Sequence, residues 1–142
     1  MTVQVQVSET IERPVATVFR FYVHDHVRNH PRWDPDMSLE QITVGPIGMG
    51  TIIRRRNTHF TIPVEGTMEV VEFVPDRAFA VVIHDGPAEA HGRVTFVSEG
   101  PAHTRLTISA EFLGMDESMK PTISGLIGRT MRNIKQLIES ET

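Results

Sequence analysis

The stretch KPTISGLIGRTMRNIKQLIESE, residues 120–141, has the apolar spacing of a long helix with one apolar face. The residues on this face are Ile123, Leu126, Ile127, Met131, Ile134, Leu137 and Ile138. Pro121 suits the first turn of a helix, where its missing N–H is not needed, so we expect a helix over residues 120–140. About 21 residues make a helix of about 30 Å, which is long enough to cross a whole sheet.

Alternation of polar and apolar residues dominates the chain before this helix. Val3, Val5 and Val7 alternate with polar residues, which predicts a half-buried first strand. Turn signals such as GPIGMG and DGP separate six further runs with strand character. These runs predict strands at about 37–44, 50–58, 62–74, 78–85, 88–98 and 103–113, arranged as an antiparallel meander.

Helical spacing returns between the first and second strands. The stretch VATVFRFYV after Pro14 predicts one short helix, and residues 25 to about 32 predict a second. We expect Pro31 and Pro35 to break this second helix. A seven-stranded sheet must bury one face, and only the last helix is long enough to cover it. The sequence therefore predicts one α+β domain over residues 1–142, with an antiparallel sheet curved around the C-terminal helix.

Composition excludes several classes of function. The net charge of −4 gives no electrostatic basis for gripping nucleic acid, and the absence of cysteine excludes disulfides and cysteine zinc sites. The longest apolar run, AFAVVI, is too short to enter and cross a membrane. The N-terminus alternates from its start and lacks the pattern of a signal peptide, so we expect a cytoplasmic protein. A homodimer is left open by the sequence.

Six motifs, spread over nearly the whole chain, carry a family resemblance. IERPVATVFRFYV, RWDPDM, GPIGMGT, VVEFVPDR, HTRLTISAEF and MRNIKQLIE together resemble the polyketide cyclase/dehydrase-like branch of the START and birch-pollen-allergen superfamily (SRPBCC). The resemblance implies the helix-grip fold, with a cavity between the sheet and the long helix. It also implies that a lipid-like, steroid-like or polyketide-like molecule occupies this cavity. We expect no cofactor.

Small residues on the inward face of the strands favour such a cavity. Gly66, Ala90, Gly92 and Ala110 stand where a filled core would prefer large side chains, although small residues also allow close packing. We expect the ligand to contact Trp33, Val64, Met68, Ala90, Val94, Ile108, Ala110, Phe112, Ile127 and Met131.

Trp33, in NHPRWDP at residues 29–35, has two interpretations. It could cover the cavity as a lid, with its ring on the apolar contents and its N–H toward water. It could equally be a core residue that anchors the short helices to the sheet. We favour the lid.

The run RRR at residues 54–56 predicts an inward-facing cation. Successive strand residues point to opposite faces, so at least one of the three arginines should face the cavity or its rim. We take Arg55 as the first candidate and keep Arg54 and Arg56 as substitutes. Its partner is either a ligand acid or enolate, or else Glu65 or Glu69 across the hairpin.

Two other pairs of residues could take part in chemistry. His26 and His30 are four residues apart and could share a metal ion, but a third ligand is not apparent, so we favour a solvated surface turn and expect no metal. Asp34 and Asp36 flank Pro35 and could supply a general base, although carboxylates in turns are commoner.

Three functions remain open. The first is a module that binds a small hydrophobic molecule, and we favour it because no catalytic constellation is legible. The second is a polyketide aromatase/cyclase or dehydratase, in which Arg55 or Arg54 stabilises an enolate and Asp34, His30 or Tyr22 moves protons. The third is a protein-interaction module of the same fold.

Overall fold

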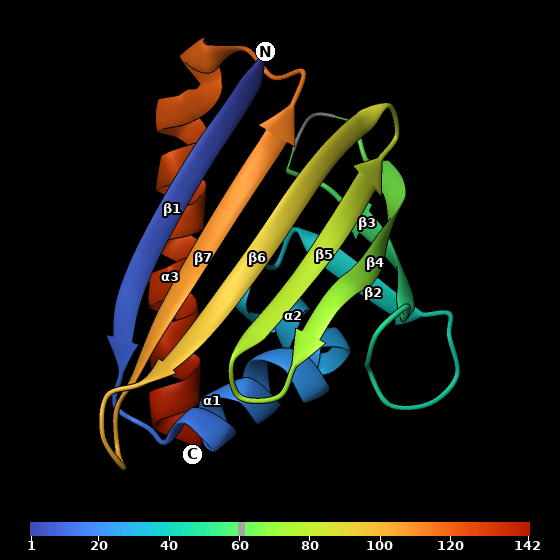
Figure 1. The fold of residues 1–142 in the computed structure, drawn as a ribbon. Helices are drawn as coiled ribbons and strands as arrows, with labels where there is room; N and C mark the ends of the chain where they lie inside the picture. The colour runs from blue at the N-terminus through green and yellow to red at the C-terminus, as the bar shows by residue number, and fades with distance from the viewer. Residues whose placement is uncertain (60–61) are drawn as a thin grey trace.

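The computed structural model describes residues 1–59 and 62–142 and contains a seven-stranded antiparallel sheet (Figure 1). Its strands lie in the order β1-β7-β6-β5-β4-β3-β2, so the last six form a meander and β1 pairs with β7. The strands are β1 (Thr2–Ile11), β2 (Met37–Gln41), β3 (Ile52–Asn57), β4 (Val64–Val74), β5 (Ala78–Asp85), β6 (Ala88–Ser98) and β7 (Thr104–Leu113). The predicted sheet is confirmed, and β2 is a few residues shorter than expected.

Helix α3 (Lys120–Glu141) lies against one face of the sheet, behind β1 and β7 in the view of Figure 1. A short 3-10 turn, η2 (Glu117–Met119), precedes it, and the Asp116 side chain accepts a hydrogen bond from the backbone N–H of Ser118 at 2.8 Å. Ile123, Met131, Ile134 and Ile138 are buried, as the apolar spacing predicts. Ile127 is only partly buried, because it faces the cavity described below.

The segment between β1 and β2 folds as α1 (Val15–Phe19), a π-helical turn η1 (Arg20–His24), and α2 (His26–Trp33). The expected break at Pro31 is wrong, since Pro31 lies inside α2. Proline removes one N–H from the helix. The helix nevertheless continues, because the Asp34 N–H donates to the His30 carbonyl at 2.9 Å and Trp33 is anchored in the core. The chain leaves the helix at Asp34, just before Pro35.

Aromatic rings fill the space between the short helices and the sheet. Phe19 packs edge-on against Phe96, with 5.0 Å between ring centroids, and Tyr22 packs in the same way against Phe79 and Phe96. This core closes one end of the space between the sheet and α3. In the described part of the chain, no helix has the length and apolarity to span a membrane.

Candidate functional site

A cavity of about 480 Å³ lies between strands β3–β7, α2 and α3. Eight of the ten residues expected to contact a ligand lie on its wall. They are Val64, Met68, Ala90, Val94, Ile108, Ala110, Phe112 and Ile127. Met131, in contrast, is buried in the core on the same helix and does not line the cavity. Most of the wall is therefore apolar and contributed by the sheet and α3.

Gly66 was expected to leave empty space for a ligand, but the structure gives another reason for a glycine here. A Cβ atom at this position would lie 1.8 Å from the backbone oxygen of His84 and 2.5 Å from Asp85 Oδ1. Gly66 therefore allows a close approach of neighbouring groups and leaves no empty space. Ala90, Gly92 and Ala110 do line the cavity.

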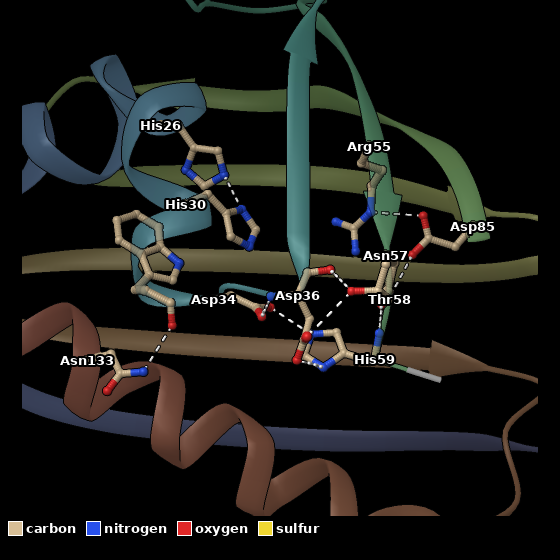
Figure 2. A network of polar contacts seen from close by, with 11 residues as sticks. His26, His30, Asp34, Asp36, Arg55, Asn57, Thr58, His59, Asp85 and Asn133 are labelled. Carbon is tan, nitrogen blue, oxygen red and sulfur yellow. Dashed lines mark hydrogen bonds and ion pairs between the residues drawn. The ribbon is translucent and has the colours of Figure 1, made fainter. Parts of the chain in front are cut away.

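Trp33 is a core residue, and the expected lid is wrong. Its side chain is only 1% exposed and does not line the cavity. The ring stacks on Tyr22 at 5.0 Å and on His30 at 5.6 Å between centroids. The Asn133 amide of α3 also donates to the Trp33 carbonyl at 3.1 Å, which ties the end of α2 to the long helix (Figure 2). A large aromatic side chain gains more from burial here than from covering an opening.

Arg55 is the arginine of the run that faces inward. It is 6% exposed and lines the cavity, whereas Arg54 and Arg56 lie on the outer face. Arg54 pairs there with Glu40 at 3.1 Å, so it cannot serve as the enolate-stabilising group considered above. The alternation of side chains along β3 produces this arrangement.

The partner of Arg55 is Asp85, and neither of the two expected partners, Glu65 and Glu69, is used. Nε of Arg55 and Oδ1 of Asp85 lie 2.9 Å apart, within ion-pair distance, although the N–H does not point at the oxygen with hydrogen-bond geometry. The Asn57 amide donates to Oδ2 of Asp85 at 3.4 Å (Figure 2). The two terminal nitrogens of Arg55 make no hydrogen bond to a residue in the described ranges 1–59 and 62–142.

His26 and His30 form a hydrogen-bonded pair inside the protein, so the expected surface turn is wrong. Nδ1 of His26 lies 2.7 Å from the Tyr22 carbonyl oxygen, and Nε2 of His26 lies 2.9 Å from Nδ1 of His30 (Figure 2). The helical spacing that could have shared a metal ion brings the two rings together directly. Both residues line the cavity. Both ring nitrogens of His26 have partners, whereas Nε2 of His30 has none among the described residues.

Burial governs the protonation of this end of the cavity. Desolvation lowers the pKa of His26 to about 4 and the pKa of His30 well below its ordinary range, and the nearby Arg55 charge acts in the same direction. Burial also raises the pKa of the Tyr22 phenol, so its hydroxyl stays protonated. Both histidines are therefore neutral at physiological pH.

Asp34, Asp36 and His59 form a second polar cluster next to the histidine pair. Nε2 of His59 lies 2.8 Å from Asp34 Oδ2, and its Nδ1 lies 3.5 Å from Asp36 Oδ2. Ligand atoms of these three residues lie within 4.8 Å of one another, which is close enough to hold a metal ion. The His59 imidazole lies between the two carboxylates and can donate a hydrogen bond to either of them without a metal ion. Asp34 also receives the Asp36 N–H at 3.2 Å, as expected for a carboxylate in a turn.

Figure 2 shows how these groups surround one end of the cavity. Arg55 and Asp85 lie across from His26 and His30, and the cluster of Asp34, Asp36 and His59 lies beside them. Sequence reasoning missed His59, Asn57 and Asp85. Asn57 follows Arg55 by two residues on the inward face of β3, a signal that strand alternation could have given, whereas Asp85 reaches the site through strand pairing and His59 through the turn after β3. The arrangement offers N–H donors from Arg55, a ring nitrogen from His30 and a hydroxyl from Tyr22 at the polar end of an apolar chamber.

A family model described as polyketide cyclase / dehydrase and lipid transport matches residues 2–139. The chain belongs to this family. No curated protein matches it by sequence.

Solved structures similar to this member of the family share its fold at low sequence identity. Ara h 8.0201 has a TM-score of 0.78 at 12% identity, with 99% of this chain and 100% of that chain covered. A truncated norcoclaurine synthase from Thalictrum flavum has a TM-score of 0.76 at 16% identity, with 100% and 96% covered. The Zhui aromatase/cyclase from Streptomyces sp. R1128 has a TM-score of 0.75 at 12% identity, with 98% and 94% covered. The helix-grip fold implied by the sequence motifs is thus confirmed.

Proposed function

We propose that the protein binds a small, mostly apolar molecule in the cavity, with the polar end of that molecule at Arg55 and His30. One observation carries the proposal: an apolar chamber of about 480 Å³ has its polar groups gathered at one end. Ligand sites typically have volumes of 300–1,000 Å³, apolar walls and a few placed polar groups. The cavity matches all three properties.

The polar end of the cavity contains buried N–H groups of Arg55 that destabilise the protein, and a bound ligand would offset this destabilisation. Arg55 is a buried cation, and Asp85 contacts only one edge of its guanidinium group. N–H groups left without an acceptor in a buried site destabilise the protein. A ligand oxygen at the other edge would supply this acceptor, while the apolar wall would bury the remainder of the molecule.

The description of the family supports the same class of ligand. Polyketides and lipids are both largely apolar molecules with oxygen-bearing groups, and both appear in that description. The similarity to the aromatase/cyclase and to Ara h 8.0201 supports the shared fold, and does not choose between binding and catalysis.

A second candidate function is a polyketide cyclase or dehydratase reaction in the same cavity. Its specific support is that Asp34, Tyr22 and His30 line the cavity together with Arg55. In such a reaction the Arg55 guanidinium would stabilise a developing enolate, and one of the other three groups would transfer a proton. Carrier and enzyme functions share the binding step, so binding is tested first.

The test is to purify the protein under native conditions and identify small molecules in the extract by mass spectrometry. We expect an apolar molecule with one oxygen-bearing end, and we expect 2-naphthol, used as a probe, to bind with micromolar affinity, about −8 kcal/mol. Titration calorimetry on the extracted protein would measure this affinity.

The proposal fails if nothing copurifies and no naphthalene probe binds. If binding is found, turnover of a polyketide thioester by the wild type, abolished in Arg55→Met, would add the enzymatic function.

A further inference from the structure

We infer that the polar end of the cavity selects ligands with a hydroxyl group, and that His26 imposes this selection by fixing the tautomer of His30. The inference rests on the proposed binding function and deepens it. His26 is thereby a positioning residue, which acts on the ligand only through His30. The constraint passes along a chain of hydrogen bonds from the protein backbone to the cavity.

The first step fixes the tautomer of His26. Its Nδ1 lies 2.7 Å from the carbonyl oxygen of Tyr22. A carbonyl oxygen can only accept, so Nδ1 of His26 must carry the hydrogen. Because His26 is buried and neutral, its Nε2 then carries a lone pair and can only accept.

The second step transfers this constraint to His30. Nδ1 of His30 lies 2.9 Å from Nε2 of His26, and it must donate because the other nitrogen can only accept. The neutral His30 ring consequently presents an unprotonated Nε2. His30 lines the cavity, and its Nε2 makes no hydrogen bond to any residue that the structure describes. A ligand group that meets this atom must donate a hydrogen bond.

The protonation of His30 limits the kind of donor that its Nε2 can meet. Burial and the charge of Arg55 disfavour a proton on His30, so the ring accepts a hydrogen bond and does not retain the proton. A neutral hydroxyl fits this role. Arg55, on the other side of the same end, presents only donors and requires a ligand oxygen that accepts.

The two requirements together define a class of ligand. Asp85 already balances the charge of Arg55, so the accepting oxygen need not be an anion. The ligand we infer is an apolar molecule whose polar end carries a hydroxyl and a separate carbonyl-type oxygen, as in a phenol or enol with a neighbouring ketone. This differs from the acid or enolate that the arginine run alone suggested.

The direct test is nuclear magnetic resonance of the imidazole nitrogens in the ¹⁵N-labelled wild-type protein, because protonated and unprotonated ring nitrogens have different chemical shifts. The spectra of His26→Gln and His30→Gln assign the two rings. We expect both rings to carry hydrogen on Nδ1 and none on Nε2. A hydrogen on Nε2 of His30 in the wild type would overturn the inference, whatever the variants show.

A binding test separates selection from the cavity itself. The matched probes are 2-naphthol, which can donate a hydrogen bond, and 2-methoxynaphthalene, which cannot. We expect the wild type to prefer 2-naphthol by about 3- to 10-fold, the effect of one net hydrogen bond. His26→Gln should keep this preference, because the glutamine oxygen can accept from His30 Nδ1. His26→Leu removes the acceptor, so His30 can place its hydrogen on Nε2, and the preference should disappear or reverse.

The outcomes distinguish the two proposals. If neither probe binds the wild type, the proposed function fails and the inference fails with it. If both probes bind equally to the wild type and to the variants, the cavity binds ligands but His30 does not select among them, and only the inference fails. Loss of preference in His26→Leu together with its retention in His26→Gln supports the inference.

Discussion

Arg55 on β3 and Asp85 on β5 form an ion pair across the intervening strand β4, with 2.9 Å between Nε and Oδ1. Gly66 stands opposite both residues in the strand register. Because Gly66 has no side chain, the two charged groups can meet over the backbone of β4. The cation at the polar end of the cavity thus depends on one residue from each of three adjacent strands.

The substitution Asp85→Asn should destabilise the protein by about 3–5 kcal/mol, because it leaves the buried Arg55 charge without its partner. Urea unfolding measures this change. The matched control is Glu40→Gln, which removes the partner of the exposed Arg54 and should cost no more than about 1 kcal/mol. If both variants lost the same unfolding free energy, the buried ion pair of Arg55 would contribute no more to stability than the exposed pair of Arg54.

The substitution Gly66→Ala should cost about 1–3 kcal/mol or more, because the new Cβ atom would overlap the His84 backbone oxygen and crowd Asp85 Oδ1. Gly125→Ala is the control, since a Cβ in this part of α3 meets no atom within 4 Å. Alanine is favoured over glycine in helices, so the control should gain about 0.5–1 kcal/mol. Thermal unfolding of both variants checks the contrast. A neutral Gly66→Ala would mean that the strands separate easily at this point.

Stability should fall as the pH is lowered from about 6.5 to about 4, the interval between the ordinary pKa of His26 and its value in the folded protein. In this interval the unfolded chain binds a proton that the folded protein does not, which favours unfolding. The loss from His26 alone is on the order of 3 kcal/mol when complete, and His30 acts in the same direction.

Urea midpoints at pH 7 and pH 4.5 measure this loss. His26→Gln is the control, because glutamine can accept from His30 without titrating. The variant should lose less stability than the wild type between the two pH values, although it is less stable at pH 7. The same loss in both proteins would assign the pH dependence to other groups.

Strand alternation and helical spacing were sufficient to predict the fold, because each element buries one regular face. The apolar face of residues 120–140 fixed the covering helix, and turn signals separated the strands. Pro31 was misjudged because the packing of Trp33 and the Asp34–His30 hydrogen bond hold α2 together beyond the proline. Local preference is a weak guide wherever tertiary contacts are this strong.

The polar end of the cavity was only partly predictable. Alternation along β3 indicated that at least one arginine of the run faces inward. Only the structure shows that the inward arginine is Arg55 and not Arg54 or Arg56. Asp85 could not be predicted as the partner of Arg55, because a bulge between Val70 and Glu72 shifts the register of β4 with β5 by one residue. Without that shift the pairing beyond the bulge would place Gly86 opposite Gly66. No pattern in the sequence marks the bulge.

The histidine pair was misjudged for another reason. Polar neighbours along the sequence suggested a surface turn, but Asn29 is itself buried and donates to the Phe21 carbonyl at 2.9 Å. Hydrogen bonds of this kind allow a polar helix to face the interior. The polar residues His26 and Asn29 of α2 therefore make satisfied contacts inside the protein, whereas Arg28 and Arg32 of the same helix are exposed.

Filling the cavity should abolish binding without unfolding the protein, and Ala110→Leu is the substitution that tests this. Ala110 lies on β7 and lines the cavity, opposite Gly92 of β6 in register. A leucine there occupies space that a ligand needs, so the affinity for 2-naphthol should fall by about 10-fold or more, equivalent to about 1.4 kcal/mol. Because the side chain enters existing space, unfolding free energy should change by less than about 1.5 kcal/mol.

The control is Ser109→Leu, which adds a leucine at the adjacent position, on the opposite face of the same strand. Calorimetric titration should show unchanged affinity in this control. Equal affinity in Ala110→Leu and the wild type would place the ligand elsewhere and contradict the proposed site.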